Sequence, residues 1–267
     1  MKTLLAIALW TAGACAAADS ASAVSLDRGY DQMYNGQFED AHKTFRGWEA
    51  AHPASPLGPV SEAAAYLFGE LNRLHILQSE FFIENRSSAA QARAADPAVK
   101  ERFLKELERT EQLSAASPGT DADAQFAVVL DHGLRSDYLA LVERRQVAAL
   151  REIKQGRGVA ERLLAAHPDC YDANFAIGME NYLLSARAAV VRFVLRSGGA
   201  EADRQTGIEK LRLTAEKGRY VAPFARLMLA VAAIREKDYE VARTELNALI
   251  ARYPRNELLR EELARIK

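Results

Sequence analysis

Residues 223–256 contain the pattern that most constrains what this chain can fold into. Pro223 suits the first turn of a helix, where a missing N–H costs no intrahelical hydrogen bond. Asp238 stands where a carboxylate can cap a second helix, and Pro254 ends that helix. The second helix has one apolar face, formed by Ala242, Leu246, Leu249 and Ile250. Two antiparallel helices joined by a turn at 236–238 cannot bury their apolar faces alone, so similar pairs are expected to stack on them.

This segment resembles the tetratricopeptide repeat, a helix-turn-helix unit of about 34 residues. The resemblance rests on Leu229, Asp238, Tyr239, Ala242, Leu246 and Pro254. The segment departs from the family pattern at Arg226 and Lys237, where an aromatic residue and a glycine are usual. The resemblance implies an all-α fold, an α-solenoid of stacked antiparallel helix pairs, whose mode of action is to bind other proteins.

Residues 25–53 hold the second clear repeat. The matching positions are Gly29, Gly36, Phe38, Ala41, Phe45 and Pro53. We expect Gly36 in the turn between two helices, where a left-handed backbone is cheap only for glycine. Helix ends at Pro53, Pro168 and Pro254 echo one another, but their intervals are not multiples of 34. We therefore expect a helical repeat domain over residues 24–267 that is irregular in the middle, with diverged repeats between the two clear ones.

The diverged middle contains several expected helices. We predict a long apolar helix over residues 56–84 and a charged helix that starts at Asp96-Pro97 and ends near Ala116. Helical spacing over residues 121–154 is followed by Gln155-Gly156-Arg157-Gly158, which we predict to be a turn before a short helix at 159–167. A last helix over 257–267 is expected to cap the stack.

The N-terminal residues have the features of a secretory signal. Lys2 gives a basic start, residues 4–10 an apolar core, and the alanine-rich stretches at 16–18 and 21–23 two possible cleavage sites. We therefore expect residues 1–23 to be a signal peptide and the protein to be exported, to the periplasm or the outer membrane of a bacterium. Alternatively, the stretch is a lipoprotein signal with Cys15 acylated, in which case the lipid anchor would be the means of membrane association.

The sequence shows no motif for catalysis, a cofactor or a metal. The five histidines lack metal-ligand spacing, and GxSxG, GxGxxG and P-loop motifs are missing. Glutamates alternate with arginines along the helices, which is typical of solvated faces. The formal net charge of -1 gives no electrostatic reason to expect a nucleic-acid partner. We expect a non-catalytic protein without a cofactor; an all-α enzyme acting on cell-wall material is the alternative from another class, but no region remains for its catalytic domain.

In the tetratricopeptide family, ligand peptides usually lie in the concave groove lined by the first helix of each pair. The groove positions carried onto this chain are Tyr30, Met33, Tyr34, Phe175, Met179, Tyr182, Leu227, Val231, Ile234 and Arg235. The resemblance therefore implies a scaffold of the cell envelope that holds a protein or peptide in this groove, or an outer-membrane assembly lipoprotein built from the same repeats. Aromatic and methionine side chains at helical spacing can equally be core residues, so both interpretations stay open.

Overall fold

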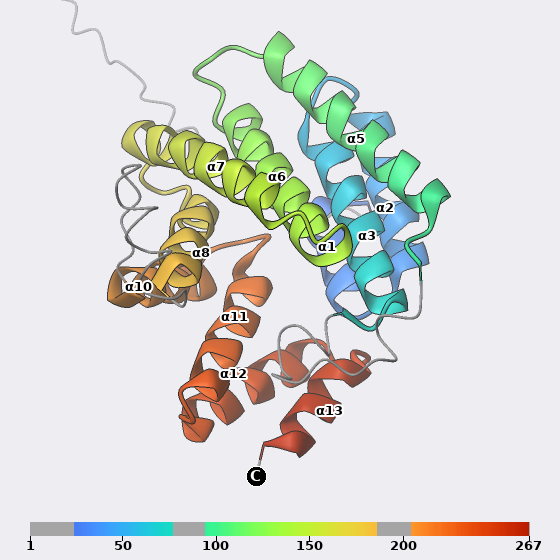
Figure 1. Cartoon of the computed structure of the whole chain (residues 1–267). Helices are drawn as coiled ribbons and strands as arrows, with labels where there is room; N and C mark the ends of the chain where they lie inside the picture. Colours follow the sequence, from blue (N-terminus) through green and yellow to red (C-terminus); the bar gives the residue numbers. More distant parts are fainter. Residues whose placement is uncertain (1–23, 77–93, 186–203, 267) are drawn as a thin grey trace, which may run out of the picture.

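The computed structural model describes residues 24–76, 94–185 and 204–266, and these ranges are all-helical, without a β-strand (Figure 1). The expected signal peptide at 1–23, and with it Cys15, lies outside the described residues. Successive helices pack against each other in adjacent pairs, which is consistent with a solenoid-like all-α fold. The expected all-α class is therefore confirmed for the described residues.

The elements follow the numbering of Figure 1. In chain order they are α1 (Leu26–Tyr34), α2 (Phe38–Ala51), α3 (Leu57–Arg73), α5 (Pro97–Ala116), α6 (Ala122–Asp137), a π-helical turn η1 (Tyr138–Val142), α7 (Gln146–Ala166), a 3₁₀ turn η2 (Tyr171–Ala173), α8 (Asn174–Ser185), α10 (Arg204–Lys217), α11 (Ala222–Arg235), α12 (Tyr239–Arg252) and α13 (Glu257–Arg265). The closest packing joins α1 with α2, α3 with α5, α6 with α7, α8 with α10, and α11 with α12, while α13 packs on α12.

The first and last pairs form as the local sequence signals predict. Gly36 has a φ of 76° in the turn between α1 and α2. Lys237 has a φ of 61° in the turn between α11 and α12, so it takes up a backbone conformation that favours glycine. The side chain of Asp238 caps α12 by accepting the N–H of Val241 at 3.3 Å.

The predicted turn at residues 155–158 is wrong. Helix α7 runs through these residues from Gln146 to Ala166, and the chain reverses earlier, after the π-helical turn and at Arg144, whose φ is 61°. Gly156 lies where α7 crosses α6, and a Cβ there would stand 3.0 Å from the Cβ of His132. The glycine thus serves close helix packing, which the sequence pattern alone does not distinguish from a turn.

The long apolar helix expected over residues 56–84 is shorter within the described part of the chain. Helix α3 ends at Arg73, and His75 then has a φ of 56°. Residues 77–84 of that prediction lie outside the described ranges. The helix expected after Asp96 is confirmed as α5, because the Asp96 carboxylate accepts the N–H of Ala98 at 2.8 Å and Pro97 occupies the first turn.

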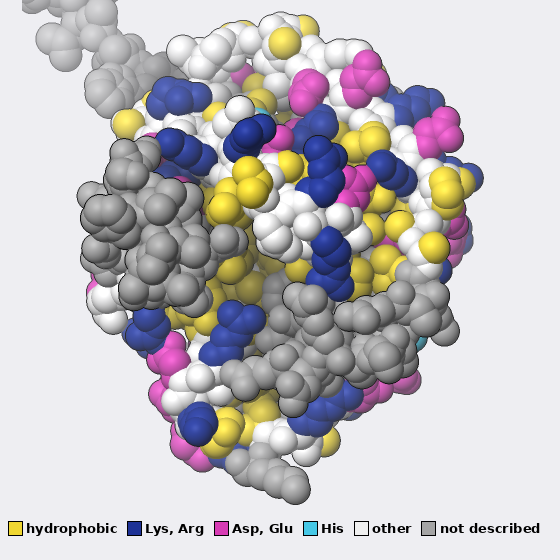
Figure 2. Space-filling model, in the orientation of Figure 1, with side chains coloured by type: hydrophobic (Ala, Val, Ile, Leu, Met, Phe, Trp, Pro, Cys, Tyr) yellow, Lys and Arg dark blue, Asp and Glu magenta, His cyan; other side chains and the backbone are white. Residues whose placement is uncertain are grey.

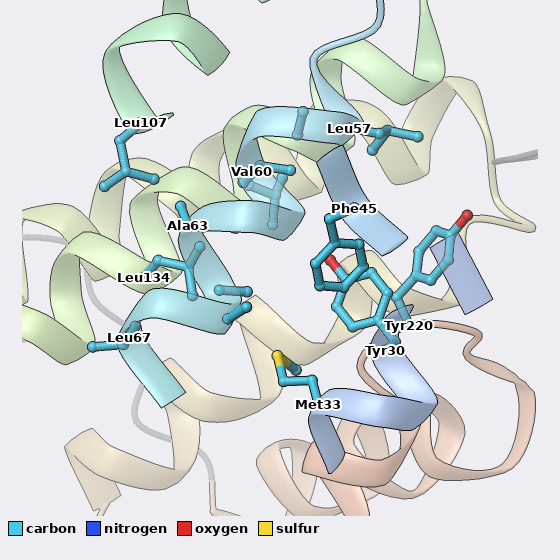
Figure 3. Packing of buried hydrophobic residues seen from close by; sticks show 14 of the residues in the cluster. Tyr30, Met33, Phe45, Leu57, Val60, Ala63, Leu67, Leu107, Leu134 and Tyr220 are labelled. Atoms are coloured by element: carbon cyan, nitrogen blue, oxygen red, sulfur yellow. The ribbon is translucent and has the colours of Figure 1, made fainter. Parts of the chain in front are cut away.

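The core beside α1 is built from aromatic rings (Figure 3). The Tyr30 ring lies 5.3 Å from that of Phe45 and 4.9 Å from that of Tyr220, measured between centroids. Gly29 leaves the space that Phe45 fills, since a Cβ at Gly29 would stand 2.2 Å from that ring. A residue of the α10–α11 loop thus completes the core of the first helix pair.

Further contacts bring the two ends of the helical array together. Arg219, in the loop before α11, pairs with both carboxylate oxygens of Asp27 on α1 at 2.7 and 2.6 Å. The side-chain amide of Asn256 donates to the carbonyl of Tyr34 at 2.9 Å, and the rings of Tyr34 and Tyr253 lie 5.5 Å apart. The pairs therefore follow a curve that returns to its start, an arrangement we call the ring (Figure 1).

Candidate functional site

A cavity lies at the centre of the ring, and we call it the central cavity. Its walls come from the first helix of each pair, α1, α3, α6, α8 and α11, with contributions from α7 and η2. The space open to the centre of a water-sized sphere is about 100 Å³. Figure 2 shows a hollow on one face of the molecule in which hydrophobic side chains are visible. Gly133, one of the lining residues, is exposed, so the cavity reaches the molecular surface there.

Most of the cavity wall is aromatic or aliphatic. Its large apolar and aromatic side chains are Tyr30, Met33, Tyr34, Phe68, Phe126, Val129, Leu130, Leu134, Ile153, Phe175, Met179, Leu183, Val221 and Phe224. The ring of Phe224 lies 5.3 Å from the rings of both Phe68 and Phe175, so three helices hold one another's side chains in place. A wall built in this way is preformed, as in most small-ligand sites.

Five of the ten predicted groove residues line this cavity: Tyr30, Met33, Tyr34, Phe175 and Met179. Leu227 lines a smaller neighbouring cavity, Tyr182 and Val231 are buried in the core, Ile234 is half-buried and Arg235 is exposed. The structure thus brings together the three predicted residues of α1 and two of the three on α8, and it leaves Tyr182 and the four predicted residues of α11 outside the cavity. Whether any of the ten contacts a partner stays a prediction.

Phe68, Phe126 and Phe224 were not among the predicted residues, and they complete the aromatic wall from α3, α6 and α11. Phe224 directly follows Pro223, so the recognised helix start was a usable signal for it. The helices carrying Phe68 and Phe126 lie in the diverged middle, where no clear repeat fixes which face points inward. The missing residues therefore come mainly from segments without a recognisable repeat register.

The tyrosine hydroxyls of the wall have partners within the protein. Tyr34 donates to the carbonyl of Tyr220 at 3.0 Å, and the hydroxyl of Tyr30 accepts from Ser61 at 3.1 Å. Burial raises the pKa of both phenols above their usual value. Both rings are therefore neutral at physiological pH and supply apolar surface to the cavity.

Asp172 is a carboxyl of the wall that holds a loop. Its oxygens accept the backbone N–H groups of Arg219 at 2.8 Å, Tyr220 at 3.3 Å and Val221 at 3.0 Å. Burial still raises the pKa of this carboxyl above its usual value, because the desolvation outweighs the hydrogen bonds that lower it. Asp172 thus fixes the loop between α10 and α11 against η2.

Glu152 is a second carboxyl of the wall, and it too has a partner. Its Oε2 lies 2.8 Å from the Nδ1 of His132, which links α7 to α6. The two side chains are 23% and 21% exposed, so this pair lies at the edge of the cavity.

Asp137, the last residue of α6, is a third carboxyl of the wall. No described residue donates a hydrogen bond to it or forms an ion pair with it. Burial alone raises the pKa of this carboxyl to about 7. The side chain is half-buried in the wall of the cavity. Asp137 is thus a carboxyl in a largely apolar cavity whose hydrogen-bonding capacity no described neighbour uses.

The residue types of the wall define what it can recognise. Among the described residues, those that line the cavity include Asp137, Glu152 and Asp172 but no lysine, arginine or histidine. Within the described ranges no group of three or more histidine, cysteine and acidic side chains could hold a metal ion. The arrangement suits a small apolar group together with a hydrogen-bond donor.

Among the helices that the structure describes, none combines the length and the apolar composition needed to cross a bilayer. A comparison with protein-family models finds no match to the chain, and a comparison with the curated proteins finds no relative. The candidate site therefore rests on the geometry of the chain itself.

Proposed function

We propose that the protein is a non-catalytic scaffold of the bacterial cell envelope, with tetratricopeptide-like repeats, that binds a protein or peptide partner at the centre of its ring. In this proposal it is exported to the periplasm or the outer membrane, as the N-terminal sequence suggests. The single observation that supports it is that the first helices of successive pairs jointly line one apolar cavity. In the repeat family that the chain resembles, ligands usually bind on the inner surface formed by such first helices.

The size of the cavity sharpens the proposal. An engineered cavity of about 150 Å³ holds one benzene molecule. The central cavity, at about 100 Å³, is therefore too small for an extended peptide. We infer that the partner inserts a single side chain or terminal group there and that its remaining contacts lie on the surface around the opening. A buried anchor surrounded by weaker contacts is the usual distribution of binding energy in a protein interface.

Filling the cavity tests this proposal. Ala176 on α8 lines the cavity and is half-buried, so Ala176→Leu places three further carbon atoms in the open space. Ala165 on α7 is exposed, and Ala165→Leu is the matched control. The wild type and the control should capture the same partner after cross-linking in the native envelope, and Ala176→Leu should lose about tenfold or more of that capture.

Circular dichroism and thermal unfolding of each variant establish that the fold is intact, because an overpacked site costs only about 1–3 kcal/mol. Equal capture by all three proteins would overturn the proposal that the cavity is the binding site.

A further inference from the structure

The three carboxyls of the central cavity differ in what they already bind. Asp172 accepts three backbone N–H groups, and Glu152 lies 2.8 Å from His132. Asp137 has no such partner among the described residues. The fold thus pairs two of the acids, whereas Asp137 lines a cavity to which the described residues contribute no cationic side chain.

We propose that the central cavity binds the protonated amino group at the end of a short apolar chain and that the carboxylate of Asp137 pairs with this ammonium. The inference rests on the proposed function, since it names the chemistry of the group that the partner inserts. An apolar cavity holds the chain, and the unpartnered carboxyl selects the amine over a neutral group of the same shape.

The volume and the wall both fit such a ligand. A cavity of about 100 Å³ is somewhat smaller than one that holds the six carbons of benzene. A lysine side chain, with a four-carbon stem and an ammonium, has about five non-hydrogen atoms beyond Cα. The aromatic rings of Tyr34, Phe68 and Phe175 add faces that attract a cation. The same chemistry is supplied by the lysine of a protein partner or by a free alkylamine such as n-butylamine.

Electrostatics favours the amine strongly once the cavity is filled. A buried charge is costly unless it is paired, and in a cavity poor in water an ion pair is screened less than at the surface. Binding of an ammonium therefore stabilises the ionised form of Asp137, whose pKa burial raises to about 7 in the free protein. Affinity for the amine should consequently rise with pH from about 5 to about 8.

Other titratable groups face the same space, and none of them replaces Asp137. They are Tyr30 and Tyr34 on α1, Glu152 on α7 with its partner His132 on α6, and Asp172 on η2. The two phenols stay neutral in this pH range because burial raises their pKa values. Asp172 is engaged by the loop, and Glu152 lies at the edge against His132.

The test compares n-butylamine with n-butanol on the full chain, in phosphate buffer free of other amines. Binding is followed by ¹H–¹⁵N NMR titration near pH 8. We expect the wild type to bind the amine about tenfold or more tightly than the alcohol. Asp137→Asn should remove this preference and leave alcohol binding unchanged. Asp169→Asn, at an exposed position, is the matched control and should behave as the wild type.

Two further arms separate the possible outcomes. A peptide with an internal lysine, compared with the same peptide carrying norleucine, distinguishes a protein partner from a free amine as the source. Equal binding of amine and alcohol, or an unchanged preference in Asp137→Asn, would overturn this inference while the proposed function stands. Failure of both small ligands to bind would also overturn it, and the capture experiment with Ala176→Leu would then decide the proposed function separately. The same titration is made with Ala176→Leu. If this substitution abolishes the binding of n-butanol, the ligand binds in the central cavity.

Discussion

Two carboxyls of this protein differ in the partners that the fold gives them: Glu70, buried between α3 and α5, and Asp137, half-buried in the wall of the central cavity. Glu70 on α3 is 2% exposed at its side chain and accepts two hydrogen bonds from Arg73, at 2.8 and 2.7 Å. It also accepts the backbone N–H of Asp96 at 2.8 Å, which ties the end of α3 to the start of α5. Asp137 on α6 accepts no hydrogen bond from any described residue.

The comparison separates a carboxyl that holds helices together, such as Glu70, from a carboxyl with which no described residue pairs, such as Asp137. A buried carboxylate that holds helices together needs donors from its own chain, because an unpaired charge in the interior is strongly unfavourable. Glu70 and Asp172 meet that requirement in different ways, with a guanidinium and with backbone amides. Asp137 does not meet it, and its desolvation costs stability that a bound cation would offset.

The largest effect is expected at the inner-wall acid that has partners. Asp172→Ala leaves three backbone N–H groups without an acceptor, two of them buried and that of Arg219 partly buried, at about 1–3 kcal/mol for each buried group. We expect the free energy of unfolding to fall by about 5 kcal/mol, measured by urea denaturation. Asp169→Ala, at an exposed position nearby, should change it by less than about 0.5 kcal/mol. Equal effects of the two substitutions would show that Asp172 does not hold the loop.

At Asp137 we expect the substitution to raise the free energy of unfolding, not to lower it. The pKa of this carboxyl is raised from 3.8 to about 7, so the folded state binds more protons than the unfolded state between these values. The wild type therefore loses stability as pH rises from about 4 to about 7. Asp137→Asn removes the charge and should be more stable than the wild type by up to about 4 kcal/mol at pH 8 and by about 2 kcal/mol at pH 5.

Urea denaturation of both proteins at the two pH values measures this difference. Other groups with raised pKa values, such as Glu262 at about 7, cancel because both proteins contain them. A substitution that destabilises the protein equally at both pH values would mean that Asp137 is a structural acid like Glu70, which would remove the contrast.

The smallest of the three effects concerns Glu70. Arg73→Ala removes the two guanidinium donors of Glu70 and leaves a carboxylate that is 2% exposed with the backbone N–H of Asp96 as its remaining donor. We expect a loss of about 3 kcal/mol in the free energy of unfolding, since Arg73 itself is 42% exposed and water can partly replace it. Arg243→Ala breaks a pair with Glu240, which is 89% exposed, and should cost less than about 1 kcal/mol. A similar loss of stability in Arg73→Ala and Arg243→Ala would mean that the pair of Arg73 with Glu70 contributes no more than an ordinary surface ion pair.

Local sequence signals made several helix starts and turns predictable. Pro97 after Asp96, Asp238 before α12 and Gly36 between α1 and α2 act through backbone chemistry within a few residues, so the sequence contains the whole cause. Gly156 was misinterpreted because the same absence of a side chain serves a turn and a tight helix crossing. Only the packing partner, His132, distinguishes the two.

The candidate site was predictable in part, for the same reason. Tyr30, Tyr34 and Phe175 follow from the repeat register of their own helices. Asp137 did not stand out, because acids are common in this chain and its isolation depends on what lies around it in space. The pairing of Asp27 with Arg219 likewise joins residues far apart in the sequence, and no local sequence signal predicts it.

The contacts of α1 with the last helices have a consequence for how the protein is made. An open array of repeats can lose a terminal unit and keep the rest, since each unit touches only its neighbours. Here Tyr34 packs against Tyr253, and Phe224 on α11 closes a cavity whose first side chains belong to α1. The helices synthesised last therefore complete the wall of the central cavity, whose first residues lie on α1. A truncated chain would therefore lose the central cavity as a whole, even if most of its helices still formed.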